Sequence, residues 1–134
     1  MSNRAFVHPL LWRGLYVLAI MLVIVLSLVP NDALRQVDVI GNDKLGHALA
    51  YFTLMAFAVQ LQDARRDWSR AAFGLLLMGI VIEWLQHQSG LRRADIRDVY
   101  ANASGIVLGA LTALTPARAW LLALDRRLSR RDAS

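Results

Sequence analysis

Residues 14–29 read GLYVLAIMLVIVLSLV, an uninterrupted apolar run between Arg13 and Pro30. A bilayer core of about 30 Å requires roughly 20 helical residues to cross it. The run reaches that length when residues 10–12 are added, because the Arg13 side chain can extend to the membrane surface. We therefore predict a membrane-spanning helix over residues 10–29. The end of the run lacks the small-x-small pattern of a signal-peptide cleavage site, so we expect this helix to be retained.

Three further apolar stretches follow, each bounded by charged residues, and they predict helices over residues 44–62, 70–88 and 98–116. Together with the first helix they form a single all-α domain over residues 1–134, a bundle of four transmembrane helices with short connections. After Pro116, apolar residues recur at helical spacing beside arginines. This pattern indicates either a short C-terminal interfacial helix or a continuation of the fourth span that frays into water.

The composition is that of a membrane protein. Of the 134 residues, 57% are hydrophobic and 19% charged, which excludes a disordered chain. Cysteine is absent, which excludes disulfides, cysteine zinc sites and thiol nucleophiles. All but one of the 15 basic residues are arginine, and most lie between apolar stretches. The net charge of +5 therefore indicates anchoring among membrane lipids and not binding of nucleic acid.

The distribution of the basic residues predicts the orientation. Ten of the 15 lie in the N-terminal segment, the second loop and the tail, and five lie in the other two loops. Positive loops stay in the cytoplasm, so both termini are predicted to be cytoplasmic.

Polar residues interrupt the second and third helices near their predicted external ends. Ionisable groups inside a span are costly and by default mark a functional site. Asp43, His47 and Tyr51 stand at i, i+4 and i+8, with Lys44 beside them, so they form one stripe. In the third helix, Glu83 lies roughly 18–20 Å along the helix from the charged start, inside the hydrocarbon, and Gln86 shares its face.

The fourth helix carries a similar stripe. Asp95, Asp98 and Asn102 are followed at helical spacing by Gly105 and Gly109. We expect the two glycines to pack closely against another helix. With the N-terminus inside, all three stripes fall at the external end, where the third loop adds Arg92. The sequence therefore predicts one polar pocket at that end.

At these residues the chain resembles the VanZ-like family of small bacterial membrane proteins. The resemblance covers about half of the chain, from residue 43 to residue 109. Its name-giving member is associated with resistance to the glycopeptide teicoplanin. The resemblance implies a multi-pass protein of the bacterial inner membrane, with no established mechanism. It is carried by the ordered spacing of these residues: Asp43, Lys44, His47, Tyr51, Glu83, Gln86, Arg92, Asp95, Asp98, Asn102, Gly105 and Gly109.

Two functional interpretations of the pocket are open. In the first, Lys44, Arg92 and either Arg93 or Arg97 bind the phosphate or carboxylate of a lipid-linked or cell-envelope component, and the acidic residues orient those cations. In the second, the protein is a hydrolase or transferase acting on such a component. The catalytic candidates are then His47 as general base, Asp43 as its partner and Glu83 as acid. No nucleophile is evident, apart from Tyr51 or a water.

Two further interpretations compete with these. A metal site made by His47 and the carboxylates is disfavoured, because one histidine with acidic residues is a common combination without the usual metal-ligand spacing. No cofactor is indicated. The polar residues can also form a buried network that only fixes helix packing. The sequence leaves the oligomeric state open.

Overall fold

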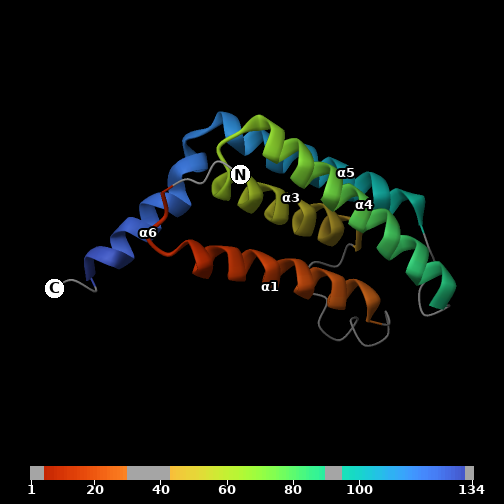
Figure 1. The fold of residues 1–134 in the computed structure, drawn as a ribbon. Helices are drawn as coiled ribbons and strands as arrows, with labels where there is room; N and C mark the ends of the chain where they lie inside the picture. The colour runs from red at the N-terminus through yellow and green to blue at the C-terminus, as the bar shows by residue number, and fades with distance from the viewer. Residues whose placement is uncertain (1–4, 30–42, 90–94, 132–134) are drawn as a thin grey trace.

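The computed structural model describes residues 5–29, 43–89 and 95–131, and every regular element in these ranges is a helix (Figure 1). The expected all-α fold is thus confirmed for this part of the chain. The elements are α1 (Pro9–Leu28), α3 (Asp43–Leu61), α4 (Arg65–Ser89), α5 (Ile96–Leu111), the short 3-10 helices η1 (Thr112–Leu114) and η2 (Pro116–Ala119), and α6 (Trp120–Arg131).

The core lies along α3. Its side chains Tyr51, Leu54, Met55 and Val59 are at most 1% exposed, and they pack against Ile106 of α5 and a leucine of α4. A helix buried to this degree needs apolar side chains around most of its circumference. The mainly apolar sequence from residue 48 to residue 59 meets that requirement.

Helices α3 and α5 lie very close together because α5 presents glycines to α3. A Cβ atom at Gly105 would overlap the carbonyl oxygen of Ala48 and lie 2.9 Å from the Phe52 nitrogen. One at Gly109 would lie 2.6 Å from the carbonyl oxygen of Phe52. Both glycines therefore pack against the backbone of α3, as small residues do at close helix crossings in membranes.

The outward faces of α1 and α4 are apolar. Along α1 only Trp12 and Ser27 are buried, while large side chains such as Leu18 and Met21 are exposed. A soluble protein rarely exposes so continuous an apolar surface. By length and composition α1 and α4 qualify as membrane spans, and α5 with α6 would qualify as a third if the bent pair forms one span. The length and apolar composition of these helices indicate that the chain is a membrane protein.

The chain bends sharply after α5. The fourth helix was expected to reach residue 116, but α5 ends at Leu111 and η1 follows. Thr115 is extended (φ −113°, ψ 161°), the conformation that a following proline favours. The segments before and after this bend meet at 82°, so α6 does not continue in the direction of α5. The tail thus forms a helix in its own direction, and its place at the membrane surface stays a prediction.

The four long helices pair by direction. Helices α1 and α4 run the same way, because Gln86 near the end of α4 bonds Ser27 near the end of α1. Helices α3 and α5 run the opposite way (Figure 1), and their starts are joined through Lys44 and Asp98.

We call the end where α3 and α5 begin the Lys44 end, and the opposite end, near α6, the Asp125 end. The third helix begins at Arg65, five residues before the predicted start, with Asp67 in its first turn.

Candidate functional site

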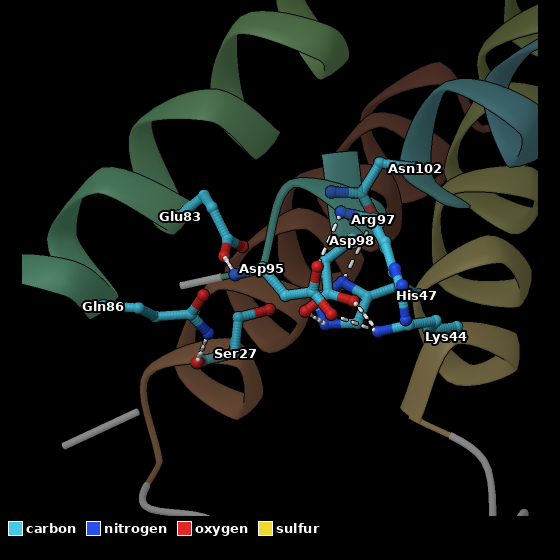
Figure 2. Close-up of polar contacts among 9 residues, drawn as sticks. All are labelled: Ser27, Lys44, His47, Glu83, Gln86, Asp95, Arg97, Asp98 and Asn102. Carbon is cyan, nitrogen blue, oxygen red and sulfur yellow. Dashed lines mark hydrogen bonds and ion pairs between the residues drawn. The ribbon is translucent and has the colours of Figure 1, made fainter. Parts of the chain in front are cut away.

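A polar cluster lies at the Lys44 end, between the starts of α3 and α5 and the last turns of α4 (Figure 2). We call it the Lys44 cluster. It consists of Lys44 and His47 from α3, Glu83 from α4, Asp95 at the start of α5, and Asp98 and Asn102 from α5.

Lys44 joins two carboxylates of α5. Its Nζ donates to Asp95 Oδ2 at 2.8 Å and to Asp98 Oδ1 at 3.0 Å. The Lys44 side chain is 41% exposed, whereas that of Asp98 is 4% exposed. The ammonium is therefore held in place from below by a buried carboxylate and remains accessible from outside. An exposed cation in a fixed position suits the recognition of an anion.

Asp95 also organises the start of α5. It is the N-cap residue, and its Oδ1 accepts the backbone N–H of Arg97 at 2.9 Å. The Lys44 ammonium, and then the Arg97 N–H, hold the pKa of this carboxyl below its usual range. Asp95 is therefore ionised at neutral pH and keeps Lys44 paired.

His47 lies deeper and is buried. Its Nδ1 is 3.1 Å from Asn102 Oδ1, an oxygen that can only accept, so Nδ1 carries the proton. Its Nε2 lies 3.9 Å from Asp98 Oδ2. The Asn102 contact thus leaves Nε2 without the proton and directs it toward the Asp98 carboxylate, so both ring nitrogens face polar groups of the protein.

Glu83 ties α4 to the start of α5. Its Oε1 accepts the backbone N–H of Asp95, and its side chain is buried (Figure 2). Beside it, Gln86 Nε2 donates to the Ser27 carbonyl oxygen at 2.6 Å. Gln86 therefore connects α4 to α1, so the polar residues of α4 link three helices.

Tyr51 lies one turn below His47 and is 1% exposed. Its hydroxyl is buried without a hydrogen-bond partner among the described residues. The hydroxyl and Asn102 Nδ2 both lie over Gly79 of α4, where a Cβ atom would be 3.1 Å and 2.9 Å from them. The absence of a side chain at Gly79 therefore leaves space for the Tyr51 hydroxyl and the Asn102 amide.

Several predicted pocket residues thus lie together: Lys44, His47, Glu83, Asp95, Asp98 and Asn102, with Tyr51 and Gln86 adjacent. Arg92, Arg93 and the side chain of Asp43 lie outside the described residues. The predicted pairing of His47 with Asp43 therefore has no structural description, and the carboxylate facing His47 here is that of Asp98. Arg97 is exposed and takes part through its backbone.

Sequence reasoning missed a second polar cluster at the Asp125 end. Asp125 of α6 is fully buried and accepts hydrogen bonds from the Trp12 indole at 2.8 Å, the His8 backbone at 3.2 Å and the Val7 backbone. The His8 ring nitrogen Nδ1 lies 3.1 Å from the same carboxylate. Asp125 thus fixes the two residues just before α1, and the Trp12 side chain within α1, against α6. An acidic residue between Leu124 and Arg126 was the only available signal.

Sequence reasoning also missed Gly79 and the carbonyl of Ser27. Gly79 has no periodic partner on its helix, and the role of Ser27 runs through its backbone, which no side-chain pattern reveals. No group of three or more histidine, aspartate or glutamate side chains within the described ranges is arranged to hold a metal ion.

No family model, curated protein or solved structure matches this chain. The function is therefore inferred from the geometry of the Lys44 cluster and from the resemblance in sequence.

Proposed function

We propose that this protein is a four-span inner-membrane protein whose Lys44 cluster binds the anionic head group of a lipid-linked or cell-envelope component at the extracytoplasmic face. The observation that carries the proposal is the convergence of ionisable side chains from three helices at one end of an otherwise apolar bundle. Asp98 and Asn102 are 3% and 2% exposed. Groups of this kind are expensive within a membrane and are retained mainly where they have a task.

The orientation predicted from the basic residues supports placing the Lys44 cluster outside the cytoplasm. With both termini in the cytoplasm, α1 and α4 run from the cytoplasmic to the external side, and α3 and α5 run back. The Lys44 end is then extracytoplasmic. The arginines at the start of α4 and in α6 then face the cytoplasm, as expected from the excess of basic residues in cytoplasmic segments.

Lys44 is the anion contact in this proposal. It combines exposure with a fixed position, and the intervening segment between α4 and α5 carries Arg92 and Arg93 in the same stretch of sequence. Arginine pairs with phosphate through two parallel hydrogen bonds, which gives selectivity for that group. The VanZ-like resemblance supports a cell-envelope component, and a link to teicoplanin resistance rests on that resemblance alone.

A structural role is the second candidate, and one observation favours it. Two polar residues of the cluster join helices to one another: Lys44 joins α3 to α5, and Glu83 joins α4 to the start of α5. A satisfied network of this type can fix helix register without binding anything. Hydrolysis or group transfer with His47 as general base has less support, because the Asp98 carboxylate lies at the nitrogen that would have to take the proton from a nucleophile.

Lipids that co-purify with the protein test the proposal. Mass spectrometry of the wild-type protein should detect a phosphate-bearing lipid species that Lys44→Gln loses. The matched control is Arg126→Gln, which removes one exposed positive charge from α6 and should retain the lipid. Equal lipid content in Lys44→Gln and the wild type would refute Lys44 as the anion contact.

A further inference from the structure

A groove separates α1 from α4 and lies apart from the Lys44 cluster. Its volume is about 500 Å³, within the usual range for sites that bind small ligands. Tyr16 and Ile20 of α1 line one side, and Arg70, Gly74 and Met78 of α4 line the other. The proposed function does not use this groove.

The two walls change from basic to apolar in the same direction. On α1, Arg13 precedes Tyr16 and Ile20, at successive spacings of three and four residues. On α4, Arg70 precedes Gly74 and Met78 at spacings of four. Residues at these spacings share one helix face. Because α1 and α4 run in the same direction, Arg70 of the groove wall and Arg13, which precedes the lining residues of α1, both lie toward the Asp125 end.

Arg70 is well placed for an anion at the mouth of the groove. Its Nη1 contacts Asp67 Oδ1 at 3.3 Å, while its side chain stays 61% exposed. Asp67 is buried beside the groove, so it orients the guanidinium without covering it. Arg66, one turn earlier on α4, is exposed and adds a second positive charge near this end.

We infer that the α1–α4 groove binds one acyl chain of an anionic phospholipid, with Arg70 holding the phosphate. The apolar wall from Arg70 to Met78 extends about 12 Å by helical rise, below the level of the guanidinium. A phospholipid places its charged group and its hydrocarbon chain in this order, and basic residues at head-group depth attract anionic lipids. A soluble anion would leave the apolar wall without a partner.

Gly74 provides a sharp test because a Cβ atom there would have no heavy atom within 4 Å. Gly74→Leu therefore adds a side chain in open space within the groove without a clash. A Cβ atom at Gly14 of α1 would likewise have no heavy atom within 4 Å, and Gly14 does not line the groove. Gly14→Leu is thus the matched control, with the same added side chain on an apolar helix.

The experiment titrates the purified full-length chain in detergent with phosphatidylglycerol or with phosphatidylcholine of identical acyl chains, and follows the thermal midpoint. We expect phosphatidylglycerol to raise the midpoint at lower concentration than phosphatidylcholine. Gly74→Leu should weaken this response about tenfold or more, and Arg70→Gln should weaken it about tenfold for phosphatidylglycerol alone, because a charged hydrogen bond is lost. Gly14→Leu should respond as the wild type does.

Three outcomes would overturn the inference: an unchanged response in Gly74→Leu, an equal response to the two lipids in the wild type, or a dimer in solution that Gly74→Leu dissociates. The last outcome would assign the groove to a second copy of the chain. The lipid response of Gly74→Leu reports on the groove, to which no residue of the Lys44 cluster contributes. The groove and the Lys44 cluster can therefore fail independently.

Discussion

Lys44 and the two aspartates of α5 show how far residue spacing predicted the candidate site. Asp95, Asp98 and Asn102 were placed on one face by their spacing, and His47 was placed on a stripe of α3. The structure brings these side chains within hydrogen-bond or ion-pair distance of one another. Spacing could not reveal that Asp98 faces His47, because that contact depends on how α3 and α5 are rotated against each other.

Gly105 and Gly109 give the first prediction at the scale of single residues. Gly105→Leu or Gly109→Leu should lower the free energy of unfolding by more than about 3 kcal/mol, because each new side chain would displace the backbone of α3. Folded yield and thermal stability in detergent measure this. Gly14→Leu adds the same side chain in open space and should change stability by no more than about 0.5 kcal/mol. Equal behaviour of all three variants would contradict the close packing of α3 and α5.

At the scale of elements, the four apolar stretches each correspond to a helix, but their ends were harder to predict. The start of α4 was predicted too late, because its first turn is polar and the prediction relied on apolar residues. Helix α5 ends before the predicted residue 116, and Pro116 itself favours the extended conformation of the residue that precedes it. The hydrogen bonds of Asp125 to Val7 and Trp12 join residues more than 110 positions apart, and no local pattern contains that information.

Asp125 should hold α6 against the start of α1. Asp125→Ala should lower the free energy of unfolding by about 3 kcal/mol, because it removes a charged acceptor from the buried Trp12 indole and from the part-buried N–H groups of Val7 and His8. Thermal stability and hydrogen exchange at residues 7–12 measure the loss. Arg126→Ala, at the exposed neighbouring position, should change neither. Unchanged protection of the α1 start in Asp125→Ala would show that the contact contributes nothing.

The same contact predicts a pH dependence. Burial by itself raises the pKa of the Asp125 carboxyl, but the bonds from Trp12, Val7 and His8 outweigh it and leave the pKa below its ordinary value. The ionised Asp125 carboxylate stabilises the fold when the pH is above the pKa of this group in the unfolded chain, near 3.8. This stabilisation is lost as the pH falls through the lower pKa of the group in the folded protein. The stability difference between wild type and Asp125→Asn should therefore be constant above about pH 5 and shrink below about pH 4. A difference that grows on acidification would contradict the lowered pKa.

For the whole molecule, the central geometric expectation is the orientation. The chain has no cysteine, so single cysteines report topology without background. In intact cells, Asn3→Cys, Ser69→Cys and Ser134→Cys should be protected from an impermeant thiol reagent, whereas Gln36→Cys should react, because basic segments remain inside. Labelling of Ser69→Cys from outside would place the Lys44 end in the cytoplasm and remove the basis for an envelope ligand.

The most direct test of the proposed function pairs stability with lipid retention in Asp98→Asn. This substitution keeps an acceptor oxygen for Lys44 and removes one buried charge. Because Lys44 is 41% exposed and screened by water, we expect the free energy of unfolding to fall by less than about 1 kcal/mol. The co-purifying phosphate-bearing lipid should nevertheless be lost, because the neutral amide holds the Lys44 ammonium less firmly in the position where it contacts the phosphate. A joint loss of lipid and of about 3–5 kcal/mol of stability, as for a buried ion pair that only holds helices together, would contradict a ligand-binding role.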